Sequence, residues 1–191
     1  MVRSRTVWAC AALLTVTLGA TAMPAVAAPA AAQRAVAACP TGWGSLDKSD
    51  FAGTSGESVT NVRTGRHDCY DRFVVDVPGA SADQLGYAVG YVDELIQDGS
   101  GKPIPINGGA ILDIRVMAPA YDPETGTATY PGVPRQPLPG VNLTGYSTFR
   151  DTRYGVSFEG QTQFGLGVRA RLPFRVLQLD GHLVVDVAHS W

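Results

Sequence analysis

The sequence predicts an all-β domain. Short runs in which apolar and polar residues alternate recur along the chain, and this period of two is typical of half-buried strands. The 191 residues include 22 glycines and 13 prolines, which divide the chain into short elements. No run combines the length and the 3.6-residue period of a long helix. These three observations favour one domain built from short strands and turns.

The first 27 residues have the features of a secretory signal peptide. Arg3 and Arg5 precede an apolar run over residues 7–20, and the stretch 25–27 offers a small-x-small cleavage site. The apolar run is shorter than the ~20 residues that a membrane-spanning helix needs, although a membrane anchor is the alternative. We therefore predict cleavage, no membrane span afterwards, and a secreted, extracytoplasmic protein, with the cell wall as a possible place of association.

Residues 28–38, with the sequence APAAAQRAVAA, show no strand or helix pattern, which predicts a flexible N-terminal segment. The ordered domain is then expected over residues 39–191. Two cysteines remain after signal cleavage, Cys39 and Cys69, and in an oxidising compartment such a pair predicts one disulfide. A disulfide across this loop would stabilise the fold by roughly 3.5 to 4 kcal/mol. A reactive or metal-binding thiol is the alternative, although the pair lacks C-x-x-C spacing.

The charge of the mature chain limits its partners. Without Arg3 and Arg5, 13 basic residues face 17 acidic ones, which gives a net charge of −4. A nucleic-acid-binding protein or a polybasic membrane-surface protein would carry the opposite sign. We therefore predict no nucleic-acid partner.

The first strand pair is predicted over residues 58–63 and 70–77, joined by a polar turn. In the second run Phe73, Val75 and Val77 share one face. Further strands are predicted over residues 87–95 and, beginning near residue 111, over a run in which Leu112, Ile114 and Val116 alternate with Asp113 and Arg115. A short edge-like piece over 104–106 lies between them.

A long proline-rich loop follows. Six prolines fall between Pro119 and Gly140, and a loop of this length is either a plain surface connection or part of a ligand-binding surface. Strands are expected again over residues 141–146 and 147–154.

The last part of the chain carries the clearest strand signal. Three strands are predicted over residues 164–171, 174–179 and 183–187, and the last two form a hairpin around Asp180–Gly181. The pentapeptide Leu183–Val187, LVVDV, nearly repeats Phe73–Val77, FVVDV. This similarity is either a coincidence of strand composition or the mark of two β units related by pseudo-symmetry.

Several blocks together resemble the AMIN-like domain of secreted actinobacterial proteins, a family similar to the AMIN domain of cell-wall amidases. The blocks are TGWGS at 41–45, TNVRTGRHDCYDRFVVDV at 60–77, the stretch 90–122, FEGQTQFGLGVRARLPFRV at 158–176 and HLVVDVAH at 182–189. The resemblance implies a small β-sandwich of two sheets, here with a long proline-rich loop. It also implies a non-catalytic role, because the catalytic centre of those amidases lies in another domain.

Catalytic and metal-binding patterns are weak. His67, His182 and His189 with Glu159 or Asp68 lack the short spacings of zinc hydrolases. A G-x-S-x-G serine motif and EF-hand spacing are absent as well. We predict no enzyme, no metal site and no cofactor, with a metal-dependent hydrolase as the least favoured alternative.

A binding function is favoured instead. Arginines and an aromatic residue gather in the last third of the chain and are predicted to bind a carboxylate or phosphate. The alternative is that these arginines cover the outer face of a sheet and pair with acidic residues of neighbouring strands. The expected ligand is peptidoglycan or another acidic envelope polymer, and an envelope protein is the alternative partner. The candidate ligand-binding residues are Arg150, Arg153, Tyr154, Arg169, Arg171 and Arg175.

Overall fold

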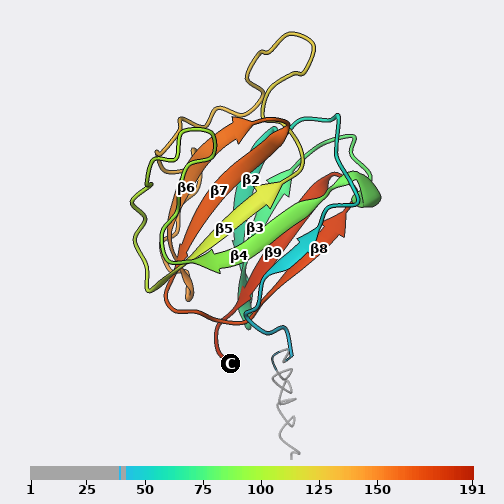
Figure 1. The fold of residues 1–191 in the computed structure, drawn as a ribbon. Helices are drawn as coiled ribbons and strands as arrows, with labels where there is room; N and C mark the ends of the chain where they lie inside the picture. Colours follow the sequence, from blue (N-terminus) through green and yellow to red (C-terminus); the bar gives the residue numbers. More distant parts are fainter. Residues whose placement is uncertain (1–38, 40–41) are drawn as a thin grey trace, which may run out of the picture. The chain divides into compact units, whose positions relative to one another are not determined.

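The computed structural model describes Cys39 and residues 42–191, so the predicted signal peptide 1–27 and N-terminal segment 28–38 lie outside the described residues. The described residues form two antiparallel sheets that pack face to face (Figure 1). The five-stranded sheet has the order β1-β4-β5-β7-β6, and the four-stranded sheet has the order β2-β3-β9-β8. This confirms the predicted all-β sandwich.

Strand bounds follow the alternating runs of the sequence. The five-stranded sheet consists of β1 (Lys48–Asp50), β4 (Tyr87–Val92), β5 (Ala110–Val116), β6 (Phe149–Phe158) and β7 (Gln161–Val168). The four-stranded sheet consists of β2 (Asn61–Arg66), β3 (Tyr70–Asp76), β8 (Phe174–Leu179) and β9 (His182–Ala188). A 3-10 turn, η1 (Ala82–Gln84), precedes β4.

The predicted hairpin around Asp180–Gly181 is present, and Gly181 has the positive φ of 75° that such a turn requires. Several predicted bounds differ from the structure: β2 spans 61–66 and not 58–63, β4 ends at Val92 and not at residue 95, and β6 spans 149–158 and not 147–154. Two further differences have a cause in the contacts. β7 ends at Val168 and not at residue 171, because the N–H of Arg169 donates to the carbonyl of Thr148 and the chain bends away. Residues 141–146 form turns and no strand, and their apolar side chains pack against the core.

The core lies between the two sheets. Phe73 and Val75 of β3 face Leu112 and Ile114 of β5, and all four are fully buried. The rings of Phe73 and Phe164 meet across the sheets, with centroids 6.0 Å apart. Because fully burying a Leu, Ile or Phe side chain is worth ~1.5–3 kcal/mol, these inward faces supply most of the driving force for folding.

The proline-rich segment is part of the scaffold. The N–H of Arg135 donates to the carbonyl of Tyr154, and the N–H of Tyr154 donates to the carbonyl of Gln136. These bonds lie along the free edge of β6, and Tyr130 and Leu138 of the same segment are buried in the core. The segment therefore covers an edge strand that would otherwise be open to pairing with another chain.

The two similar pentapeptides lie side by side. β3 and β9 are antiparallel neighbours, with Val74 opposite Val184, Phe73 opposite Val185 and Val75 opposite Leu183. The repeat is therefore related by a local two-fold axis through the Val74–Val184 pair, within one sheet. The same axis relates the β2–β3 hairpin to the β8–β9 hairpin, which agrees with the alternative of two β units related by pseudo-symmetry, both within one sheet.

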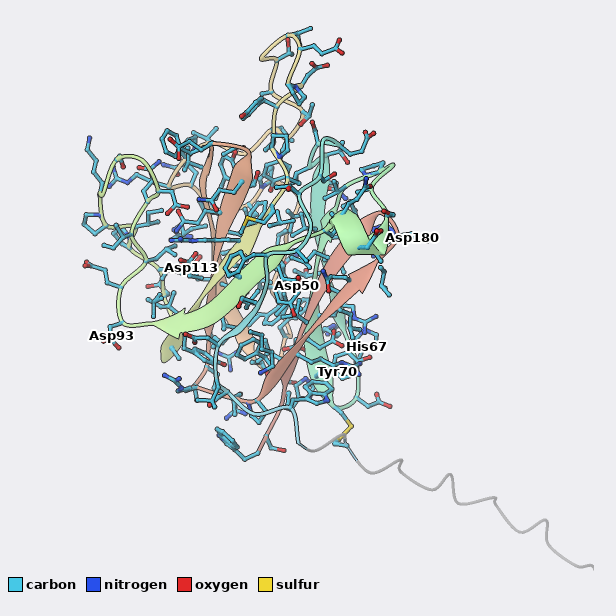
Figure 2. The ribbon with its side chains drawn as sticks, turned by 45° about the vertical axis from the view of Figure 1, so that its right-hand side comes forward. Asp50, His67, Tyr70, Asp93, Asp113 and Asp180 are labelled. Carbon is cyan, nitrogen blue, oxygen red and sulfur yellow. A yellow bond between two sulfur atoms is a disulfide. The ribbon has the colours of Figure 1, made fainter. Side chains whose placement is uncertain are left out.

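The predicted disulfide is present. Cys39 and Cys69 are joined, with their Cα atoms 5.2 Å apart. Cys69 directly precedes β3, and Figure 2 shows the sulfur–sulfur bond below Tyr70. The bond therefore fixes the chain ahead of β1 to the start of a central strand.

Candidate binding site

The connection between β4 and β5 covers the β7 side of the outer face of the five-stranded sheet. This connection approaches β7 closely because β7 has glycines on its outer face. A Cβ atom at Gly165 would lie 2.2 Å from Leu95 Cδ2, and one at Gly167 would lie 2.0 Å from the carbonyl oxygen of Asn107. The covering segment thus occupies the β7 side of the face and leaves the β4 side open.

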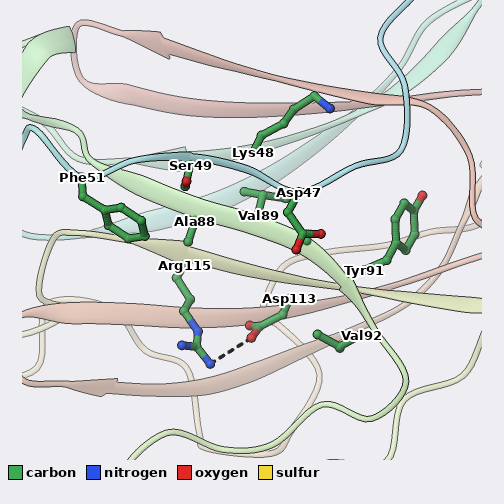
Figure 3. A pocket seen from close by; sticks show the side chains of 11 residues that line it. Asp47, Lys48, Ser49, Phe51, Ala88, Val89, Tyr91, Val92, Asp113 and Arg115 are labelled. Carbon is green, nitrogen blue, oxygen red and sulfur yellow. Dashed lines mark ion pairs between the residues drawn. The ribbon is translucent and has the colours of Figure 1, made fainter.

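The open half contains a groove of about 350 Å³ (Figure 3). Ala88 and Gly90 of β4 form a floor with almost no side-chain volume. A Cβ atom at Gly90 would lie 2.6 Å from Asp47 Oδ1, so the Asp47 carboxylate lies over this end of the floor. Phe51, which is 67% exposed, stands beside this floor.

Charged side chains line the side of the groove formed by β5. Arg115 Nη2 lies 3.0 Å from Asp113 Oδ2 and 2.9 Å from Asp98 Oδ1, so two carboxylates share one guanidinium. Gln163 Nε2 also donates to Asp113 Oδ1, over 3.1 Å. Arg115 Nε is buried and has no hydrogen-bond partner among the described residues. The cluster therefore carries a net negative charge and an unused donor.

Burial raises the pKa of Asp113, and the neighbouring Asp98 adds to this rise, while Arg115 and Gln163 oppose it. Burial is the largest cause, so the ionised carboxylate has lost more hydration than its neighbours replace. A hydrogen-bond donor on a ligand would return part of that stabilisation.

A second cavity, also of about 350 Å³, lies where β4 ends and β5 begins. Tyr91 and Val92 line both this cavity and the groove. Of the six predicted ligand-binding residues, Arg171 lines the second cavity. Its guanidinium lies 5.1 Å from the centroid of the Tyr91 ring and donates to the carbonyl oxygen of Ser45 over 3.3 Å.

The other predicted arginines are separated. Arg153 pairs with Asp151, and Arg175 on β8 donates to Asp186 over 2.9 Å. Arg150 donates to backbone carbonyls of residues 146, 147 and 149, and Arg169 donates to the carbonyl of residue 189. These contacts lie on β6, on β8 and in the connection before β8, so the arginines do not form one common site.

Tyr154 requires a correction. Its side chain is 5% exposed and packs in the core, with its ring 5.3 Å from that of Tyr130 and 5.8 Å from that of Phe164. The inward alternation of β6 carries it between the sheets, so it cannot meet a ligand at the surface.

On the outer face of the four-stranded sheet, ion pairs run from strand to strand. Asp186 is fully buried and accepts two hydrogen bonds from Arg72, over 2.7 and 2.9 Å, besides the one from Arg175. Asp76 accepts from Arg63 over 3.1 Å and contacts His182 Nδ1 at 2.8 Å. Arg175 thus follows the structural alternative that the sequence allowed.

The three histidines occupy different environments. His182 pairs with Asp76, His189 Nε2 lies 3.1 Å from Asp71 Oδ1, and His67 stacks on Tyr70 with ring centroids 4.4 Å apart. Among Cys39 and residues 42–191, no three His, Cys, Asp or Glu side chains are grouped to hold a metal ion.

A family model described as AMIN-like domain matches residues 57–189. No curated protein and no solved structure matches the chain. The floor of the groove and its β5 side lie inside the matched region, whereas Asp47 and Phe51 precede it. Within the part of the chain that the structure describes, no helix is both long and apolar enough to cross a membrane.

Proposed function

We propose, from the premise that this chain belongs to the AMIN-like domain family, that it binds peptidoglycan or another glycan-containing polymer of the cell envelope. Membership of the family indicates a non-catalytic, extracytoplasmic domain associated with the envelope. The observation that supports glycan binding is the groove over Ala88 and Gly90, with the exposed ring of Phe51 beside it.

The groove suits a sugar ring. A floor made by Ala88 and Gly90 lets a flat ligand approach the sheet closely, and an aromatic ring such as Phe51 can cover the apolar face of a sugar. The carboxylates of Asp47 and Asp113 can accept hydrogen bonds from hydroxyl groups. A volume of about 350 Å³ is at the lower end of the usual range for ligand sites, which fits a short segment of polymer.

The test is sedimentation of the purified protein with purified sacculi at moderate salt. Phe51→Ala is expected to weaken binding about tenfold, which corresponds to about 1.4 kcal/mol. Leu179→Ala is the matched control, since Leu179 is a 46% exposed apolar residue on the four-stranded sheet. Equal sedimentation of the Phe51 variant and the wild-type protein would reject the groove. No enrichment over an unrelated β-sandwich would reject envelope-polymer binding altogether.

An envelope protein is the second candidate partner. Two large apolar side chains, Leu46 at 77% and Trp191 at 73%, are exposed. Both are next to the contacts of Arg171, which donates to the carbonyl of Ser45 and whose own carbonyl accepts from Trp191 Nε1. Exposed apolar patches often mark protein contacts. A protein partner would stay bound in affinity purification after enzymatic digestion of the wall, whereas a wall contact would be lost.

A further inference from the structure

The second cavity has a wall without side chains. A Cβ atom at Gly108 would lie 2.7 Å from the carbonyl oxygen of Val168, and one at Gly109 would lie 2.2 Å from that of Arg169. The backbone of this glycine pair therefore packs directly on the end of β7. The cavity beside it stays open, and the polar side chains that reach it come from its two other sides.

Arg171 supplies a positive charge that the protein leaves without an ionic partner. Unlike Arg153 and Arg175, it forms no ion pair with any carboxylate of the described residues. Stacking on Tyr91 and one hydrogen bond to Ser45 hold its guanidinium in place. A guanidinium has five N–H donors in a planar fork, so enough remain for a carboxylate to bind with both oxygens.

Asp93 supplies the opposite charge. It follows the last residue of β4 and is exposed, and Figure 2 shows it at the margin of the domain. It lines the same cavity as Arg171 but does not pair with it. The two side chains come from separate parts of the chain, the end of β4 and the connection between β7 and β8, so their charges remain available on the lining of one cavity.

We propose that this cavity binds the free end of an amino acid that carries both an ammonium and a carboxylate group, with Arg171 holding the carboxylate and Asp93 holding the ammonium. The inference rests on the proposed function, because the cavity and the groove share Tyr91 and Val92. A polymer that joins sugars to short peptides would place a sugar in the groove and the end of an attached peptide in the cavity.

The test measures binding of the full protein to disaccharide-peptide fragments released from peptidoglycan by a muramidase. Three forms of the fragment are compared by calorimetry: one with a free zwitterionic peptide end, one with that carboxylate amidated and one with that ammonium acetylated. We expect each modification to weaken binding at least tenfold. Arg171→Gln should abolish the discrimination against the amidated fragment, and Asp93→Asn should abolish the discrimination against the acetylated one.

Arg169→Gln is the matched control, since Arg169 is an exposed arginine of the same connection and is not among the residues that line the cavity. It should keep both discriminations, and all three variants should keep the unfolding midpoint of the wild-type protein. Equal affinity for the three fragments would overturn the proposal, as would a discrimination that survives Arg171→Gln and Asp93→Asn. Peptide-free glycan fragments separate the two hypotheses. If they bind and lose affinity in Phe51→Ala while the peptide end has no effect, the groove stands and the cavity proposal fails.

Discussion

The outer faces of the two sheets use charge in different ways. On the four-stranded sheet, Asp186 accepts hydrogen bonds from two arginines, and Asp76 pairs with Arg63 and with His182. Beside the groove of the five-stranded sheet, the Arg115 guanidinium serves two carboxylates, and its buried Nε has no partner among the described residues. The cations on the four-stranded sheet therefore pair with carboxylates of neighbouring strands and hold these strands together. Beside the open groove two carboxylates share one cation, so this face is the better place for a ligand that donates hydrogen bonds.

The local two-fold axis explains the pairing on the four-stranded sheet. Asp76 and Asp186 occupy equivalent positions of the repeated pentapeptide, opposite His182 and Arg72 respectively. Each aspartate therefore meets a basic side chain from the neighbouring central strand. The repeat encodes a ladder of opposite charges across β3 and β9, and cross-strand pairs of this kind stabilise a sheet.

The largest expected effect comes from removing the Cys39–Cys69 disulfide, which holds the start of β3 in the four-stranded sheet. Replacing both Cys39 and Cys69 by serine should lower the free energy of unfolding by about 3.5 kcal/mol, since the bond closes a loop with a sequence separation of 30. Sacculus binding at a temperature where the variant is folded should not change. Denaturant unfolding measures the loss, and reductant should destabilise the wild-type protein but not the variant. A variant with wild-type stability would show that the disulfide does not stabilise the four-stranded side of the domain.

The next effect compares one aspartate from each face. Asp186→Asn leaves Arg72 and Arg175 side by side without the carboxylate that neutralises them. Breaking such a buried pair costs about 3 kcal/mol when the partner cations are partly exposed, as here. Asp113→Asn should cost less than about 1 kcal/mol, because Arg115 keeps Asp98. Chemical denaturation of both variants measures the contrast, and equal losses would show that the faces do not differ.

Local patterns in the sequence were sufficient to predict most of the fold. The alternation in Phe73–Val77 and Leu112–Val116 and the turn at Asp180–Gly181 depend on neighbouring residues alone, and the structure confirms them. The end of β7 was wrong because the hydrogen bond from Arg169 to Thr148 joins segments that are distant in sequence. Tyr154 was misplaced for a related reason. The residues around it, Thr152, Arg153, Gly155 and Val156, do not alternate clearly, and only the pairing of β6 shows which face is inward.

The groove could not be predicted because it depends on packing between distant segments. Phe51 directly follows the short strand β1, and its neighbours in the groove come from β4 and β5. The open floor depends on a missing side chain at Gly90, which is a weak signal in a chain with 22 glycines. Arg171 was predicted from its residue type. The pairing of Arg175 with Asp186 required the register of β8 and β9.

A smaller effect is expected from filling the groove. Ala88→Leu should reduce binding to sacculi about tenfold, or about 1.4 kcal/mol, because the added atoms occupy the floor. Stability should change by less than about 1 kcal/mol, since the residue lies on the open outer face and has room for the larger side chain. Ala88→Ser keeps nearly the same volume and should bind normally. Unchanged binding by the leucine variant would place the ligand elsewhere, for instance on the four-stranded sheet.

The smallest expected effect is the pH dependence of the five-stranded face. Because burial raises the pKa of Asp113, the folded protein holds this proton more tightly than the unfolded chain does. The contribution of Asp113 to stability is therefore most favourable at low pH and is lost as the pH rises from the ordinary aspartate range through the raised pKa. Asp113→Asn removes this dependence. Relative to the wild-type protein, the variant should thus be more stable at pH 7 than at pH 4 in denaturant unfolding. If its relative stability instead increased as the pH fell, pairing with Arg115 would outweigh burial, and this face would resemble the fully paired one.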